Sequence, residues 1–208
     1  MSVQLITAPA IEPVTLDEAR AHLRVDFLDD DSLIVALISA ARLHAEMLTG
    51  RSFITTRWKS VLDSFPGPSL MGVPFGASFT LPLHAILLHK CPVASIVSIQ
   101  YLDMAGTLQT MPSTDYTADL ACEPARITPV FGKIWPISLP QIGAVQVTFD
   151  TGYGTTPDTV PAGIRHWIKL RLGSLYEHRE EVAIMSRGKI EPLPFVDGLL
   201  DPYRVVSI

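Results

Sequence analysis

The sequence predicts an α+β protein in which a small helical bundle carries an inserted antiparallel β domain. Apolar residues recur at three- and four-residue spacing near both ends of the chain, which is typical of amphipathic helices. In the middle, apolar and polar residues alternate along several short stretches and proline becomes frequent, which is typical of antiparallel sheets. We therefore expect residues 1–52 and 156–208 to form a helical domain, and residues 53–155 to form the β domain.

The chain is expected to start with an extended leader, residues 1–14. Thr15 and Glu18 follow with the spacing of a capping box, in which each side chain accepts a hydrogen bond from the other residue's backbone. This signal predicts a short first helix over residues 16–24.

A second helix is predicted over residues 32–49, where apolar residues form a broad stripe and Gly50 suits the C-terminal end. An acidic run with Asp29, Asp30 and Asp31 comes directly before it. Aspartates in this place cap free N–H groups and favour the positive end of a helix. Clustered carboxylates also bind magnesium in nucleases. The capping interpretation is favoured, because no second acidic cluster stands at a matching spacing.

The β domain is predicted from period-two alternation. A turn at residues 104–106 joins two of its strands into a hairpin, and the stretch 65–80 is a loop rich in glycine and proline. The expected strands cover residues 56–62, 95–101, 107–111, 116–120, 125–130 and 144–149.

A third helix is predicted over residues 161–179, after a strand that ends at Gly152 and Gly154. Pro161 suits its first turn, because the N–H that proline lacks would have no partner there. One apolar stripe runs along this helix, made of Ile164, Trp167, Ile168, Leu172, Leu175 and Tyr176.

The third helix is also the basic segment of an acidic protein. Arg165, Lys169 and Arg171 are candidates for its polar face, where they would contact DNA phosphates or an acidic surface of a partner. The alternative is an ordinary solvated face, which the nearby Glu177 and Glu180 favour.

The C-terminal part has weaker signals. Residues 182–194 lack periodicity and are expected to form a loop or arm, and residues 195–200 fit one or two helical turns. Residues 203–208 are β-prone, so this tail either adds a strand to a neighbouring subunit or packs on its own domain.

Composition limits the classes of function. Hydrophobic residues make up 48% of the 208 residues and charged residues 18%, which fits either a subunit that hides surface against its own copies or a β-rich core. The net charge of −5 argues against attraction of the whole surface to DNA or to anionic membranes. No run reaches membrane-spanning length and the N-terminus lacks signal-peptide features, so we expect a soluble cytoplasmic product with no membrane partner.

No catalytic or metal-binding motif is found, so we expect no enzymatic activity, cofactor or metal. The phosphate-binding, hydrolase and zinc-protease patterns are all missing. His84, His89 and Cys91 lie close together, but a second pair at zinc spacing is missing. Two cysteines are too few for a disulfide framework, so Cys91 and Cys122 are expected to be free thiols.

Four segments, in this order and spacing, resemble the head–tail connector (adaptor) proteins of long-tailed bacteriophages and prophages. They are VTLDEARAHLRVD, DDDSLIVALISAARLHAEMLTGRSF, the strand–GYG–loop–Pro–basic helix unit, and the ending LLDPYRV. The likeness is to the longer members, which carry a β insertion between their helices.

The resemblance implies a structural protein of the virion. Such proteins form a ring, usually of twelve subunits, beneath the portal at the head–tail junction, after assembly in the host cytoplasm. The ring extends the channel through which double-stranded DNA passes without sequence specificity. It also docks the next head-completion protein, a stopper or tail-completion protein.

The resemblance also implies roles for named residues. The three predicted helices would build the ring, with Arg165, Lys169 and Arg171 lining the channel or pairing with the acidic face Asp29–Asp31 of a neighbour. The role of the β insertion stays open. The arm that faces the portal would contain Phe195, Leu199, Leu200, Tyr203, Arg204 and Val205.

Two other classes of function remain as alternatives. A DNA-binding packaging factor would bind DNA as an isolated monomer, with an affinity that falls with salt. A metal-dependent nuclease would use Asp29–Asp31 and would lose activity with a chelator.

Overall fold

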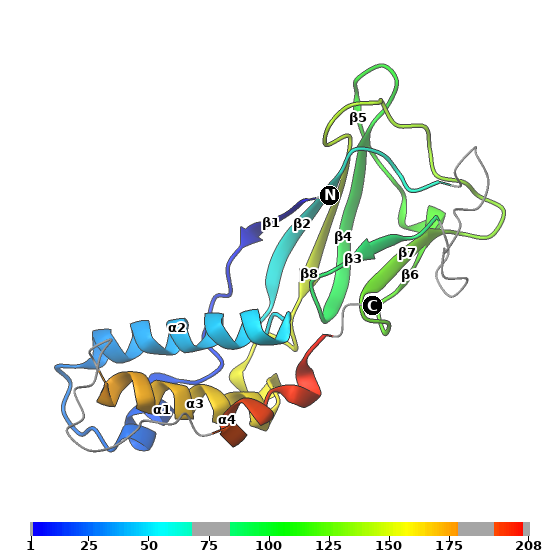
Figure 1. Ribbon diagram of the computed structural model, residues 1–208. Coiled ribbons are helices and arrows are strands. Elements are labelled where there is room, and N and C mark those ends of the chain that lie inside the picture. The colour runs from blue at the N-terminus through cyan, green and yellow to red at the C-terminus, as the bar shows by residue number, and fades with distance from the viewer. Residues whose placement is uncertain (1, 68–83, 179–193, 206–208) are drawn as a thin grey trace. The chain divides into compact units, whose positions relative to one another are not determined.

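The computed structural model describes residues 2–67, 84–178 and 194–205 (Figure 1). Most of the predicted loop 65–80, nearly all of the predicted arm 182–194 and the last three residues of the tail lie outside the described residues. Within these ranges the chain contains four α-helices and eight strands that pair antiparallel. The predicted α+β fold class is confirmed.

The chain divides into two compact units. The β unit contains Met1–Ala8 and Thr55–Gly152, and the helical unit contains Pro9–Ile54 and Tyr153–Ile208. The first residues differ from the expected leader, because Ser2–Thr7 form strand β1, which pairs with β2 in the β unit. Such a pairing across more than fifty residues leaves no trace in the local pattern of a six-residue segment.

The larger sheet of the β unit has five strands in the order β1-β2-β8-β4-β5 (Figure 1). Alternation along β8 is complete, with Val145, Val147 and Phe149 buried and the residues between them half-buried. The strands after β1 are β2 (Thr56–Leu62), β8 (Val145–Thr151), β4 (Val93–Leu102) and β5 (Leu108–Thr110).

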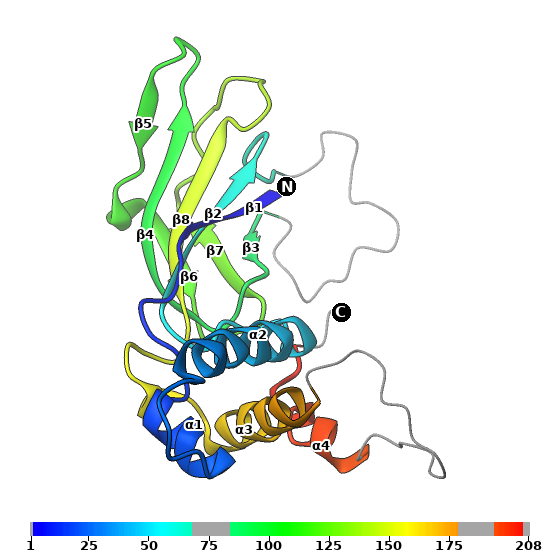
Figure 2. The ribbon, with the colours of Figure 1, turned by 90° about the vertical axis from the view of Figure 1, so that its left-hand side faces the viewer.

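A second sheet has three strands in the order β3-β7-β6, and Figure 2 shows it beside the larger one. Ile86 and Leu88 of β3 and Ile127 of β7 share a core with Ile99 and Phe149 of the larger sheet. The two sheets therefore enclose one hydrophobic core. The strands are β3 (Ile86–Leu88), β7 (Ala125–Pro129) and β6 (Tyr116–Asp119), with a short 3-10 turn at Ser113–Asp115 before β6.

The helical unit starts with α1 (Leu16–Leu23), whose capping box is present as predicted. The hydroxyl of Thr15 accepts from the Glu18 N–H, and the Glu18 carboxylate accepts from the Thr15 N–H, each over 3.2 Å. The box satisfies two N–H groups that a helix start otherwise leaves without partners.

Helices α2 (Asp31–Thr49) and α3 (Ala162–Glu177) form the centre of this unit. Ile34 and Ile38 of α2 and Trp167 and Ile168 of α3 are buried in one cluster. The predicted stripes of both helices therefore face a shared core. Shorter elements follow, namely the 3-10 turn Pro157–Thr159 before α3, then α4 (Pro194–Gly198) and the 3-10 turn Asp201–Tyr203.

Helix α2 has the length and the hydropathy of a membrane-spanning helix, although its longest uninterrupted apolar run is short. Core helices of soluble proteins pass the same test. Arg42 in the middle of α2 is buried and forms ion pairs with Glu12 and Glu46. Helix α2 therefore contains a buried arginine whose charge is paired with two carboxylates.

The Gly152-Tyr153-Gly154 turn follows β8 for steric reasons. Gly152 has φ of +116°, a conformation that side chains disfavour. A Cβ atom on Gly154 would lie 2.7 Å from the Thr159 side chain. The backbone conformation favours glycine at position 152, and the nearby Thr159 side chain favours it at position 154, in agreement with the turn interpretation.

Candidate interaction surfaces

Arg165, which is predicted to line the channel, forms ion pairs within its own unit. Its guanidinium pairs with Glu18 of α1, and it donates to Asp158 over 3.2 Å. The side chain is only 18% exposed. Because Glu18 also closes the capping box, Arg165 links the start of α1 to α3.

Lys169 and Arg171 are half-buried on α3. The His22 side chain on α1 is exposed, and its pKa is lowered first by partial desolvation and then by the charges of Lys169 and His166, so these three groups lie close together. Lys169 forms no ion pair with another described residue. The Nε of Arg171 is buried and has no hydrogen-bond partner among the described residues.

The acidic run before α2 makes tertiary contacts. Asp31 accepts two hydrogen bonds from Arg20 of α1, over 2.7 and 2.6 Å, and Asp30 accepts one from the Tyr176 hydroxyl of α3 over 2.5 Å. Asp29 is exposed. Asp30 occupies the N-cap position, but its side chain makes no capping hydrogen bond, so the side-chain capping expected there is wrong. The carboxylates of Asp30 and Asp31 are instead directed to Tyr176 and Arg20.

The described C-terminal arm packs on its own unit. Leu200 is completely buried, and the Val205 N–H donates to the Thr49 carbonyl over 2.9 Å. The Arg51 side chain donates to the Tyr203 carbonyl over 2.5 Å. Leu199 is half-buried against the same core, Arg204 is exposed, and for Phe195 only the backbone is described. The packing alternative for the tail therefore holds for residues 199–205.

No group of three or more metal-ligating side chains occurs among the described residues. His84 and His89 are exposed, whereas Cys91 is buried, so the three do not converge. Cys91 and Cys122 are free thiols, as predicted.

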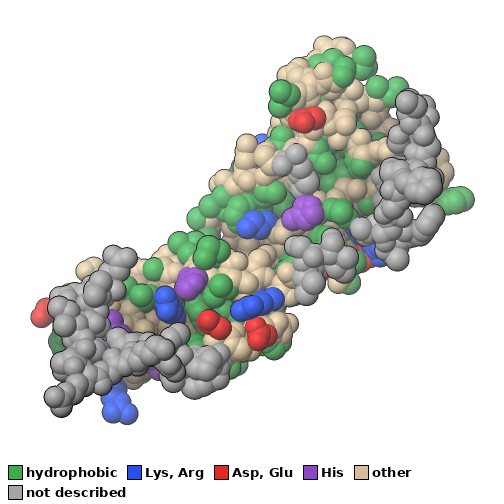
Figure 3. Space-filling view, viewed as in Figure 1, with side chains coloured by type: hydrophobic (Ala, Val, Ile, Leu, Met, Phe, Trp, Pro, Cys, Tyr) green, Lys and Arg blue, Asp and Glu red, His purple; other side chains and the backbone are tan. Residues whose placement is uncertain are grey.

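The connection between β7 and β8 forms a surface that hydrophobic periodicity in the sequence does not identify. Residues 131–143, FGKIWPISLPQIG, contain one charged residue and expose several large apolar side chains. On the face in Figure 3, the β unit shows extensive hydrophobic and uncharged surface with few charged side chains. The sequence feature that could indicate this surface is a proline-containing stretch of apolar residues without helical or strand periodicity.

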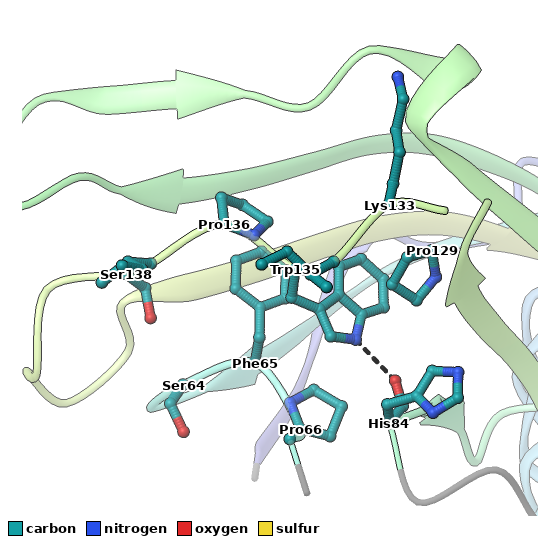
Figure 4. Close-up of a pocket in the computed structure, with 12 residues that line it drawn as sticks. Ser64, Phe65, Pro66, His84, Pro129, Lys133, Trp135, Pro136 and Ser138 are labelled. Atoms are coloured by element: carbon teal, nitrogen blue, oxygen red, sulfur yellow. Dashed lines mark hydrogen bonds between the residues drawn. The ribbon is translucent and has the colours of Figure 1, made fainter. Parts of the chain in front are cut away.

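This segment borders an open pocket of about 820 Å³ (Figure 4). Phe65 and Trp135 stack in it with ring centroids 4.8 Å apart, and the Trp135 indole N–H donates to the His84 carbonyl over 2.6 Å. Figure 4 shows the Lys133 side chain directed away from these rings. The pocket is therefore an apolar concavity suited to protein side chains.

The sequence of this chain is similar to that of a known protein family. Residues 13–72 match the family described as phage gp6-like head–tail connector protein. The predicted resemblance to head–tail connectors is confirmed. The match covers α1, α2 and β2, the part of the chain that holds the capping box and the acidic run.

Solved structures show a likeness in fold over the whole chain. A chain in "Virion of native gene transfer agent (GTA) particle" is 20% identical with a TM-score of 0.77, covering 100% of this chain and 97% of its own. A chain in "Neck of empty GTA particle computed with C6 symmetry" is 22% identical with a TM-score of 0.75, at the same coverage. A chain in "Neck of native GTA particle computed with C12 symmetry" is 21% identical with a TM-score of 0.71, again covering 100% and 97%. At these identities the likeness establishes the fold, β unit included. A comparison with curated protein sequences finds no match.

Proposed function

We propose that this chain is a structural head–tail connector subunit, which forms a ring at the neck of a tailed phage or phage-like particle. The observation that carries the proposal is the agreement of two comparisons, one with the connector family over residues 13–72 and one with neck structures over the full chain. The role is assembly without catalysis. The ring contains twelve copies, lies below the portal, extends the DNA channel and docks a stopper or tail-completion protein.

The surfaces fit this role better than the alternatives. Asp30 and Asp31 are engaged by Tyr176 and Arg20, so the acidic run does not present a free carboxylate cluster of the kind a nuclease needs. Arg165 is not available to the phosphates that a DNA-binding factor would contact, since it is ion-paired inside its unit.

Within the ring, we assign the DNA-facing role to the group around Lys169. Lys169 lies close to His22 and His166 and forms no ion pair with another described residue, so its ammonium group contacts phosphates without reading bases. Arg165 instead holds α1 in place. Among the residues predicted to face the portal, Arg204 is exposed and would reach the portal. Leu200 is instead buried in the core of its own subunit.

Deletion of the gene in a cell that makes the particle tests the proposed function. We expect packaged heads without attached tails, and joined particles again when the full chain is supplied in trans. Complete particles from the deleted strain would contradict the proposal.

A further inference from the structure

Four large apolar side chains on the segment 131–143 are almost fully exposed. Phe131 is 103% exposed, Ile134 and Ile142 are 88% exposed, and Ile137 is 77% exposed. Single exposed apolar residues are ordinary, but four within twelve residues form a patch. Covering Phe131 alone removes roughly 150 Å² or more from water, and the three isoleucines add to that area. The patch can therefore supply a substantial part of the roughly 800 Å² that each partner contributes to a standard protein interface.

The segment is held in place while it presents these side chains. Trp135 in its middle is anchored by its stack on Phe65 and its hydrogen bond to His84. Further along, the Leu139 N–H donates to the Leu102 carbonyl and the Gly143 N–H donates to the Asp63 carboxylate, both over 2.9 Å. A fixed backbone loses little conformational entropy when it binds a partner, which favours tight contact.

The charge pattern indicates an apolar protein partner. Lys133 is the one charged residue of the segment, and it forms an ion pair with Asp115 of the β unit. A surface without free charge has nothing to offer to DNA phosphates. It also matches the interface cores of proteins, which are depleted in charged residues.

A second apolar patch lies at the β1 edge of the larger sheet. Strand β1 is the edge of the five-stranded sheet, so one side of its backbone pairs with no other described strand. Its residues are uncharged, and Leu5 and Ile6 are each about half exposed. Figure 1 shows β1 at one side of the unit and the start of the β7–β8 connection beside β6 and β7 at the other.

Two different patches on one copy are what a ring requires. Copies in a cyclic assembly meet head to tail, so each contact joins one patch of a copy to another patch of the next. We propose that the segment 131–143 of one copy packs against β1 of the adjacent copy, around Leu5 and Ile6. This rests on the proposed ring, and it assigns to the β insertion a direct part in subunit contacts, which the resemblance left to the helices.

Disulfide trapping tests the pairing in the full-length chain. In a Cys122→Ser background, one preparation carries Leu5→Cys and a second carries Ile137→Cys. Mixed at high concentration under mild oxidation, they should form a covalent dimer, while each preparation alone should form no covalent link. A chain with both substitutions should give a ladder of covalent oligomers. Met104→Cys, exposed on the turn between β4 and β5, replaces Ile137→Cys in the control mixture and should stay unlinked.

The outcomes separate this inference from the proposed function. No cross-link in the mixture, or self-linking of either single variant, would overturn the head-to-tail pairing. Ile134→Asp with Ile137→Asp should weaken self-association at least tenfold without changing the melting temperature, since both side chains are exposed. If the cross-link fails while the chain is still found at the neck of particles, the pairing is wrong and the connector role stands. If the chain is absent from the neck, the proposed function fails.

Discussion

Arg165 on α3 pairs with Glu18 on α1, the residue that also closes the capping box with Thr15. This contact joins two residues 147 positions apart in the chain. Arg165 is therefore a structural residue of the helical unit, whereas Lys169 on the same helix is half-buried and forms no ion pair with another described residue.

Arg165→Ala should destabilise the helical unit by about 1–2 kcal/mol, because hydrogen bonds to a charged group are lost in a partly buried place. The matched control is Lys169→Ala on the same helix, which should leave the melting temperature unchanged. Thermal and urea unfolding measure both. Equal stability of Arg165→Ala and the parent chain would contradict the structural role of this arginine.

A second prediction concerns Arg42, whose side chain is 8% exposed between Glu12 and Glu46. Burial raises the pKa of Glu46, although Phe53 and Arg42 both donate hydrogen bonds to it. Arg42→Ala would leave two carboxylates without their cation, which should cost about 3 kcal/mol of unfolding free energy.

Arg57 provides the matched control for Arg42. It also forms a two-bond pair with a carboxylate, that of Asp150, but on the exposed surface between β2 and β8. Exposed pairs contribute little to stability, so Arg57→Ala should be much milder than Arg42→Ala in denaturant unfolding. Equal losses for the two variants would show that burial is not what makes the Arg42 pair matter.

The pH dependence of stability should reflect His22. Its folded pKa lies below the ordinary 6.5, because of partial desolvation and the charges of Lys169 and His166. As pH falls below 6.5, the unfolded chain takes up this proton first, so the contribution of His22 to stability is lost with falling pH. His22→Gln should flatten the loss of unfolding free energy between pH 7 and pH 5 (about the range in which histidine titrates).

Proton NMR titration checks the same group directly. The imidazole of His22 should titrate below 6.5, and Lys169→Met should move its midpoint upward because a repelling charge is removed. A midpoint above 6.5 in the parent chain would contradict the placement of Lys169 and His166 beside His22.

The glycine turn after β8 gives a fourth prediction. Gly154→Ala would place a Cβ within 2.7 Å of the Thr159 side chain, and relieving that overlap should cost about 1–3 kcal/mol. Gly67→Ala is the control, because open space surrounds that position. Unfolding measurements that find the two variants equally stable would contradict the steric account of Gly154.

Local patterns were sufficient for the elements and insufficient for the contacts between them. Helical spacing and the Thr15–Glu18 box predicted α1, α2 and α3 within two residues at each end. The same pattern placed Arg165 on a polar face but could not show its partner, since Glu18 lies in another helix. For the same reason the local pattern predicts Asp30 and Asp31 as helix caps. Their partners Tyr176 and Arg20 belong to other helices, so the local pattern does not indicate these contacts.

The β unit shows a different limit. Alternation identified β8 completely, but Ser2–Thr7 becomes a strand only through pairing with β2, which no local rule reports. The segment 131–143 has neither helical nor strand period, so its exposed apolar side chains could be recognised only once the fold showed which of them face outward.

A symmetry-averaged electron microscopy reconstruction of the particle neck tests the central claim most directly. The account predicts a closed ring of copies of this chain between head and tail, with the fold described above fitting each repeat of the density. A neck whose rings do not accommodate this fold, or purified particles that lack the chain, would contradict it.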